Sequence, residues 1–161
     1  MVFARMTTLI MLAMLPIALL LAGCGHSGDD EADTVSVACS SGVQYDDVSA
    51  AAADADVVLS ATIDKLTPNT GSQQGLYTLA LSASEVVKGD VGSHTLTATV
   101  NLGCEGDDFV KEFTSIYTKG TKVIALLAST EDGYTLLNPH VGVQSYSDAV
   151  FHTVQDAAKD S

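Results

Sequence analysis

The densest group of side chains that could do chemistry is the acidic cluster Glu105, Asp107 and Asp108, which lies beside Gly103 and Gly106. Paired carboxylates can act as general acid and base or bind a hard cation such as Ca²⁺. Acidic residues flanked by glycine are more often part of an exposed, solvated loop. We therefore interpret the segment as a solvated loop and keep the three acids as a candidate cation site.

Other catalytic and metal-binding patterns are missing from the sequence. The histidines are His26, His94, His140 and His152, and none has a second histidine or a cysteine at metal-ligand spacing. There is no Gly-x-Ser-x-Gly elbow, phosphate-binding glycine loop or dinucleotide fingerprint. We expect no cofactor and no metal site beyond the candidate acids, so we interpret the protein as non-enzymatic. The alternative is a carboxylate-dependent or cation-dependent envelope enzyme.

The segment that ends at Cys24 has the layout of an export signal. Arg5 is the only charged residue before Cys24, and the chain from Met6 to Leu21 is almost wholly apolar. A positive start, an apolar segment of about 7–15 residues and a small-residue exit are typical of a secretory signal. Pro16 interrupts the run, and a membrane-spanning helix needs about 20 apolar residues. The pattern favours export over a permanent membrane span.

The run ends in Leu21-Ala22-Gly23-Cys24, which resembles the lipobox of bacterial lipoproteins. The resemblance implies cleavage before Cys24, diacylglycerol on its thiol, and often a fatty acyl chain such as palmitate on the new amino terminus. Two or three acyl chains would hold the protein firmly in a bilayer. We expect a signal peptide over residues 1–23, an acidic flexible tether over 24–38 and one domain over 39–161. The predicted location is outside the cytoplasm, anchored by lipid to a bacterial membrane of the cell envelope.

The charge of the mature chain restricts its partners. The full sequence has a formal net charge of −13, and loss of Arg5 with the signal leaves six lysines against twenty acidic residues, or −14. Such a balance repels nucleic acid and anionic headgroups, because each phosphate contact needs a cation. We therefore exclude nucleic-acid binding, and expect contact with the membrane through the Cys24 anchor and with a protein partner that the sequence does not identify.

The cysteine count agrees with lipidation. Of the three cysteines, lipid on Cys24 leaves Cys39 and Cys104, an even number in an oxidising compartment. We predict a disulfide between them, which would close a loop of about 65 residues and stabilise the fold by roughly 4 kcal/mol. Two free buried thiols are the alternative.

Period-two alternation of apolar and polar residues predicts strands over residues 57–64, 77–83 and 95–100. The hairpin-turn signal Glu131-Asp132-Gly133 predicts a fifth strand over residues 134–137. Residues 122–128 are apolar on both faces and indicate a central strand. Asp46 is the expected cap of a short helix that reaches Ala55, and Ser145 with Asp148 forms a capping-box pair for a final helix. We expect a turn over residues 67–72, a bulge or strand end at 86–87, and an irregular segment over 101–121.

These elements predict a mainly β protein: a small closed five-stranded barrel with a short helix before the first strand and a C-terminal helix. The arrangement resembles the OB-fold, and within it the netrin-module and tissue-inhibitor-of-metalloproteinase class. The likeness rests on Cys39, Cys104 and the segments 55–58, 86–89 and 120–123.

That resemblance implies metalloproteinase inhibition through a mature amino-terminal cysteine, and this chain departs from the pattern. Cys39 lies well beyond the processed terminus at Cys24, and Ser40 and Ser41 replace the usual Cys-x-Cys. We instead predict a binding or interaction module that makes contact through the loops Thr67–Gln74 and Leu102–Thr121.

Overall fold

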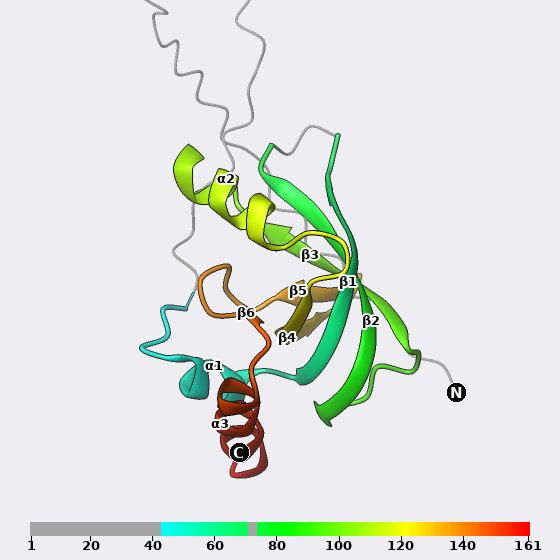
Figure 1. Cartoon of the computed structure of the whole chain (residues 1–161), viewed down its shortest axis with the longest axis vertical. Coiled ribbons are helices and arrows are strands. Elements are labelled where there is room, and N and C mark those ends of the chain that lie inside the picture. Colours follow the sequence, from blue (N-terminus) through cyan, green and yellow to red (C-terminus); the bar gives the residue numbers. More distant parts are fainter. Residues whose placement is uncertain (1–42, 71–73) are drawn as a thin grey trace, which may run out of the picture. The chain divides into compact units, whose positions relative to one another are not determined.

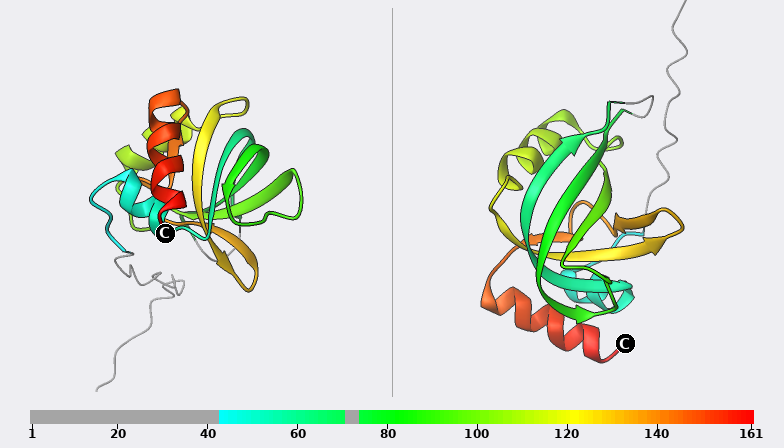
Figure 2. Two further views of the ribbon diagram at one scale, coloured as in Figure 1. Left: turned by 90° about the horizontal axis from the view of Figure 1, so that it is seen from below. Right: turned by 90° about the vertical axis from the view of Figure 1, so that its right-hand side faces the viewer.

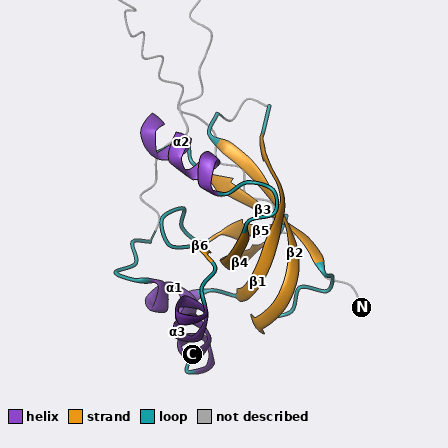
Figure 3. Cartoon of the chain, in the orientation of Figure 1, coloured by secondary structure: helices purple, strands orange, loops and turns teal. Residues whose placement is uncertain are grey.

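The computed structural model describes residues 43–70 and 74–161. The described part of the chain contains both helices and strands (Figure 3). In chain order they are α1 (Val48–Asp54), β1 (Val57–Pro68), β2 (Leu76–Lys88), β3 (Thr95–Asn101), α2 (Asp107–Ile116), β4 (Lys122–Thr130), β5 (Gly133–Leu136), β6 (Val143–Ser145) and α3 (Asp148–Lys159).

The strands form a closed five-stranded barrel. Neighbours follow the order β1-β2-β3-β5-β4, and β4 pairs back onto β1 to close the ring. The β3–β5 pairing is parallel and the others are antiparallel. The predicted OB-like architecture is therefore confirmed, including the helix before the first strand and the helix at the end. The short strand β6, which pairs with β4, was not predicted.

Alternate residues of each strand fill the barrel. On β3 the pattern is regular: Leu96, Ala98 and Val100 are buried while the threonines between them are exposed. A shift of one residue would bury hydroxyls in place of these apolar side chains, so the register is well specified. The predicted irregularity near residues 86–87 is also present, because Leu59 pairs with Val86 whereas Val58 pairs with Lys88.

A second core covers the outside of β1 and β4. Val58, Ile124 and Leu126 point away from the barrel interior and are fully buried in a cluster with residues of α1 and α3. The prediction that β4 is buried on both faces is confirmed. The prediction of one buried face for β1 is wrong, because Val58 and Ser60 on the second face are also buried, and α1 and α3 pack over Val58.

Both predicted helix caps are displaced. Asp47, not Asp46, accepts hydrogen bonds from the backbone N–H groups of Ser49 and Ala50, both at 2.9 Å. Ser147 caps α3, because Ser145 is taken up by β6, where it pairs with Val123.

The expectation of an irregular segment over 101–121 is wrong at its centre, where α2 forms. Its Phe113 is buried in the barrel core, so α2 covers one end of the barrel, while α1 and α3 lie at the other end (Figure 1). The predicted turn over 67–72 begins later than expected, since β1 continues to Pro68. Within residues 43–70 and 74–161, none of the helices has the length and apolar character needed to cross a membrane. The predicted signal peptide lies outside the described residues.

Candidate functional site

The three predicted acids lie where the chain enters α2. Asp107 and Asp108 form the first turn of this helix, where carboxylates interact favourably with the positive end of the helix dipole. Asp108 lies 3.6 Å from Lys111 in an exposed ion pair. In the part of the chain that the structure describes, no group of three or more His, Cys, Asp or Glu side chains is placed to hold a metal ion. Cation binding by these acids stays a prediction.

Glu105 makes a contact that its sequence position did not indicate. Its carboxylate lies 3.1 Å from Nε2 of His140, in the loop between β5 and β6. The His140 ring also packs on Phe109 of α2, with ring centroids 4.3 Å apart. The Glu105–His140 pair therefore joins the start of α2 to the loop between β5 and β6.

Cys104 lies in the exposed turn between β3 and α2. Its predicted disulfide partner Cys39 and the predicted lipidation site Cys24 are both outside the described residues. The disulfide and the lipid attachment stay predictions.

The surface has a groove where α2 meets β1 and β2, which we call the α2 groove. This α2 groove has a volume of about 490 Å³ and is lined by residues from three elements and the turn after α2. Its lining residues are Asp64, Lys65, Leu66, Pro68, Tyr77, Thr114, Thr118 and Lys119. Figure 2 shows α2 beside the ends of β1 and β2. The groove thus draws residues from both loops that the sequence predicted as contact surfaces.

Two backbone hydrogen bonds hold the two sides of the α2 groove together. The N–H of Gly120 donates to the carbonyl of Ile63 at 2.7 Å, and the N–H of Ile63 donates to the carbonyl of Thr121 at 2.9 Å. Gly120 has a φ of +89°, a conformation that favours glycine. Lys119 precedes this contact and Lys65 follows it, so the fold places the two lysines on either side of one junction.

The floor of the α2 groove is apolar and anchored. Leu66 and Tyr77 are half-buried and pack against the barrel core. The hydroxyl of Thr114 donates to the carbonyl of Val110 at 2.8 Å, and the carboxylate of Asp64 accepts from Ser82 at 2.7 Å. The groove therefore combines an apolar floor with two cationic side chains and one carboxylate.

Tyr117 fixes the far end of α2. Its phenol donates a 3.0 Å hydrogen bond to the carbonyl of Val143 on β6. Burial, and secondarily the charge of Glu112, raises the pKa of Tyr117, so the phenol remains protonated and able to donate. This contact holds the helix against the barrel end.

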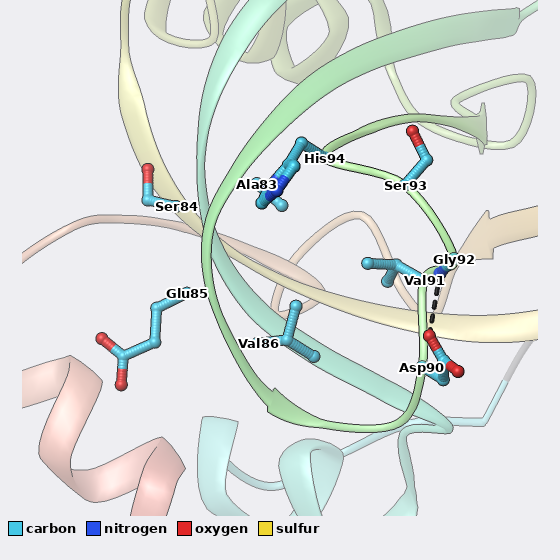
Figure 4. Close-up of a pocket in the computed structure, with 9 residues that line it drawn as sticks. All are labelled: Ala83, Ser84, Glu85, Val86, Asp90, Val91, Gly92, Ser93 and His94. Atoms are coloured by element: carbon cyan, nitrogen blue, oxygen red, sulfur yellow. Dashed lines mark hydrogen bonds between the residues drawn. The ribbon is translucent and has the colours of Figure 1, made fainter.

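A second hollow of about 370 Å³ lies between the last part of β2 and the connection that leads to β3 (Figure 4). Val86 and Val91 point into it, whereas the side chain of Glu85 points away. Asp90 accepts a 2.8 Å hydrogen bond from the N–H of Gly92, which stabilises the turn. The charged groups of this hollow do not converge, so we take the α2 groove as the candidate site.

Sequence reasoning missed Lys65 and Lys119 as a pair. They lie far apart in the chain, on opposite sides of two strands and a helix, and no motif connects them. Only the pairing of residues 120–121 with Ile63 brings them to the same groove. The sequence did place Lys119 within a predicted contact surface, the loop Leu102–Thr121, but it gave no signal for Lys65.

No protein-family model matches this chain, and the search of curated protein sequences gave no match.

Proposed function

We propose that this chain is a bacterial lipoprotein, anchored by lipid on Cys24, that presents the OB-like barrel outside the cytoplasmic membrane as a non-enzymatic binding module. The observation that carries the anchor is Leu21-Ala22-Gly23-Cys24 at the end of an apolar run with a single positive charge before it. The acidic residues that follow favour a solvated tether.

The α2 groove supports the binding role. It lies at a junction held by two short backbone hydrogen bonds, and it has an apolar floor with two cationic residues at its sides. A concave site of a few hundred Å³ with an apolar lining and a few polar groups is the usual form of a small-ligand site. The proposed partner surface is thus the α2 end of the barrel.

The anchor is tested by expressing the full-length chain in a bacterium, separating membranes from soluble protein and measuring the intact mass. We expect the chain in the membrane fraction, released by detergent and not by salt, starting at Cys24 and carrying diacylglycerol. The Cys24→Ala variant should stay unprocessed. A wild-type chain in the soluble fraction that still begins at Met1 would refute the anchor.

The carboxylate-dependent enzyme is tested with the triple variant Glu105→Gln, Asp107→Asn, Asp108→Asn. The matched control is Glu131→Gln, Asp132→Asn, which removes two exposed acids from the β4–β5 turn. A binding module retains its ligand affinity in both variants. Loss of a turnover in the triple variant alone, not restored by Ca²⁺, would replace the proposal with the enzyme.

A further inference from the structure

The lysines of the described domain differ in what they contact. Lys88 donates to the carbonyl of Ala53 and to Ser161, both at 2.8 Å, and Lys111 pairs with Asp108. Lys122 lies 3.5 Å above the ring of Tyr146. Each of these three therefore has a partner within the fold.

The two lysines of the α2 groove differ from these three. Within residues 43–70 and 74–161, neither Lys65 nor Lys119 has a carboxylate within salt-bridge distance. The last turn of α2 does not need Lys119 as a cap, because the carbonyl of Ile116 already accepts from Thr118 N–H and from the Thr121 hydroxyl. The two cations of the groove are therefore available to a ligand.

The position of these charges counters the overall field of the protein. Without Arg5 the chain carries a net charge of −14, which repels anions from most of the surface. An anion can approach only where cations are concentrated, and Lys65 and Lys119 are concentrated by the contact between Ile63 and residues 120–121. The groove also contains Asp64, whose carboxylate accepts from the Ser82 hydroxyl and not from either lysine, so the lining carries two positive charges against one negative charge.

We propose that the α2 groove binds a phosphate ester whose organic part is compact and apolar. Lys65 and Lys119 contact the phosphate, and the apolar part lies on Leu66, Pro68 and Tyr77. This proposal rests on the proposed function as a binding module and names its ligand class. A free phosphate ester and the phosphate of a lipid headgroup share this chemistry, and the experiment separates them.

The test is calorimetric titration of the detergent-solubilised full-length chain with phenyl phosphate, inorganic phosphate and benzyl alcohol. We expect phenyl phosphate to bind more tightly than either of the others, and its affinity to fall as salt is added. The double variant Lys65→Gln, Lys119→Gln should lose about tenfold in affinity, as expected for two partly screened charges. Lys111→Gln, which removes one exposed cation elsewhere, should bind as the wild type does.

A charge-conserving variant guards against a folding effect. Lys65→Arg, Lys119→Arg should retain binding, and the double glutamine variant should have the urea midpoint of the wild type. A short-chain phosphatidylglycerol, added as monomer below its micellar concentration, identifies the source: competition with phenyl phosphate indicates a headgroup, and its absence indicates a free ester. Either result supports the ligand class.

The ligand class is refuted if phenyl phosphate does not bind at millimolar concentration. It is also refuted if the control Lys111→Gln loses as much affinity for phenyl phosphate as the double variant Lys65→Gln, Lys119→Gln. Binding of a hexaglutamate peptide in place of phenyl phosphate would also overturn it, in favour of an acidic protein partner. If the chain carries lipid but does not bind phenyl phosphate, the ligand class is refuted and the lipid anchor stands. If the chain binds phenyl phosphate but carries no lipid, the anchor is refuted and the ligand class stands.

Discussion

Leu126 tests whether α1 and α3 hold the outer face of β4. The side chain is fully buried in the cluster that these two helices form over the strand. Leu126→Ala removes the equivalent of about three methylene groups, a transfer cost of about 2.4 kcal/mol at about 0.8 kcal/mol each. The cavity left behind raises the expected loss of unfolding free energy to about 3–4 kcal/mol.

The assay is urea denaturation of the full-length chain, followed by far-ultraviolet circular dichroism. With an m-value of about 2 kcal/mol/M, the midpoint should fall by about 1.5–2 M, with the m-value itself unchanged. Leu126→Met, which keeps the volume, should cost less than about 1.5 kcal/mol. Should the alanine variant fail to fold at all, the methionine variant still reports on the site.

Thr97→Ala is the control, because Thr97 is exposed on β3 and its substitution should cost less than about 1 kcal/mol. If Leu126→Ala lowered the free energy of unfolding by less than about 0.5 kcal/mol, Leu126 would behave as a surface residue does. That result would refute the reasoning, since it would mean that α1 and α3 do not cover β4.

Burial, followed by the 2.6 Å hydrogen bond to Asp54, raises the pKa of Tyr45 to about 12 from 10.0. The folded state therefore prefers the neutral phenol, so its stabilisation is complete below pH 10 and is lost as the pH rises toward 12. The pKa is measured from the phenolate absorbance of the wild type compared with that of Tyr45→Phe. Titration of Tyr45 at the ordinary tyrosine pKa would contradict the prediction. Gly89→Ala and Gly120→Ala both place alanine at positive φ, but only at Gly89 would the new Cβ lie 2.4 Å from a backbone oxygen. Urea midpoints should show a loss above about 2 kcal/mol for Gly89→Ala and about 1 kcal/mol for Gly120→Ala, and equal losses would be inconsistent with the clash. Asp47→Ala should cost about 1 kcal/mol in the same assay, whereas alanine at the preceding aspartate should cost nearly nothing; the opposite order would restore the predicted cap.

The strands were predictable because each residue's burial depends on which side of its own strand it occupies. Leu96, Ala98 and Val100 alternate with threonines, and that period alone specifies a strand with one buried face. The closed order of strands could be expected from five such segments with a helix at each end. The bounds were less accurate, since β1 continues through Pro68 into residues with turn character.

The helix caps and α2 show where local reasoning fails. Asp46 and Asp47 are chemically equal, and which of them caps depends on the residue at which the helix begins; α1 begins at Val48, so Asp47 is the cap. The stripe formed by Phe109, Phe113 and Tyr117 is compatible with a helix, but only the open end of the barrel supplies the surface that stabilises it.

By itself the sequence determined the strand pattern and the acidic charge, and it supplied the resemblance of Leu21-Ala22-Gly23-Cys24 to a lipobox, because each of these is a property of neighbouring residues or of composition. The tertiary structure alone decided that Glu105 meets His140 and that Lys65 and Lys119 share a groove. The members of each pair are separated by several elements of the fold, and no local period connects positions so far apart. Lys65 and Lys119 meet because closing the barrel and seating Phe113 in its end bring the segment after α2 onto β1 at Ile63. Glu105 and His140 meet where the start of α2 packs on the β5–β6 loop through Phe109.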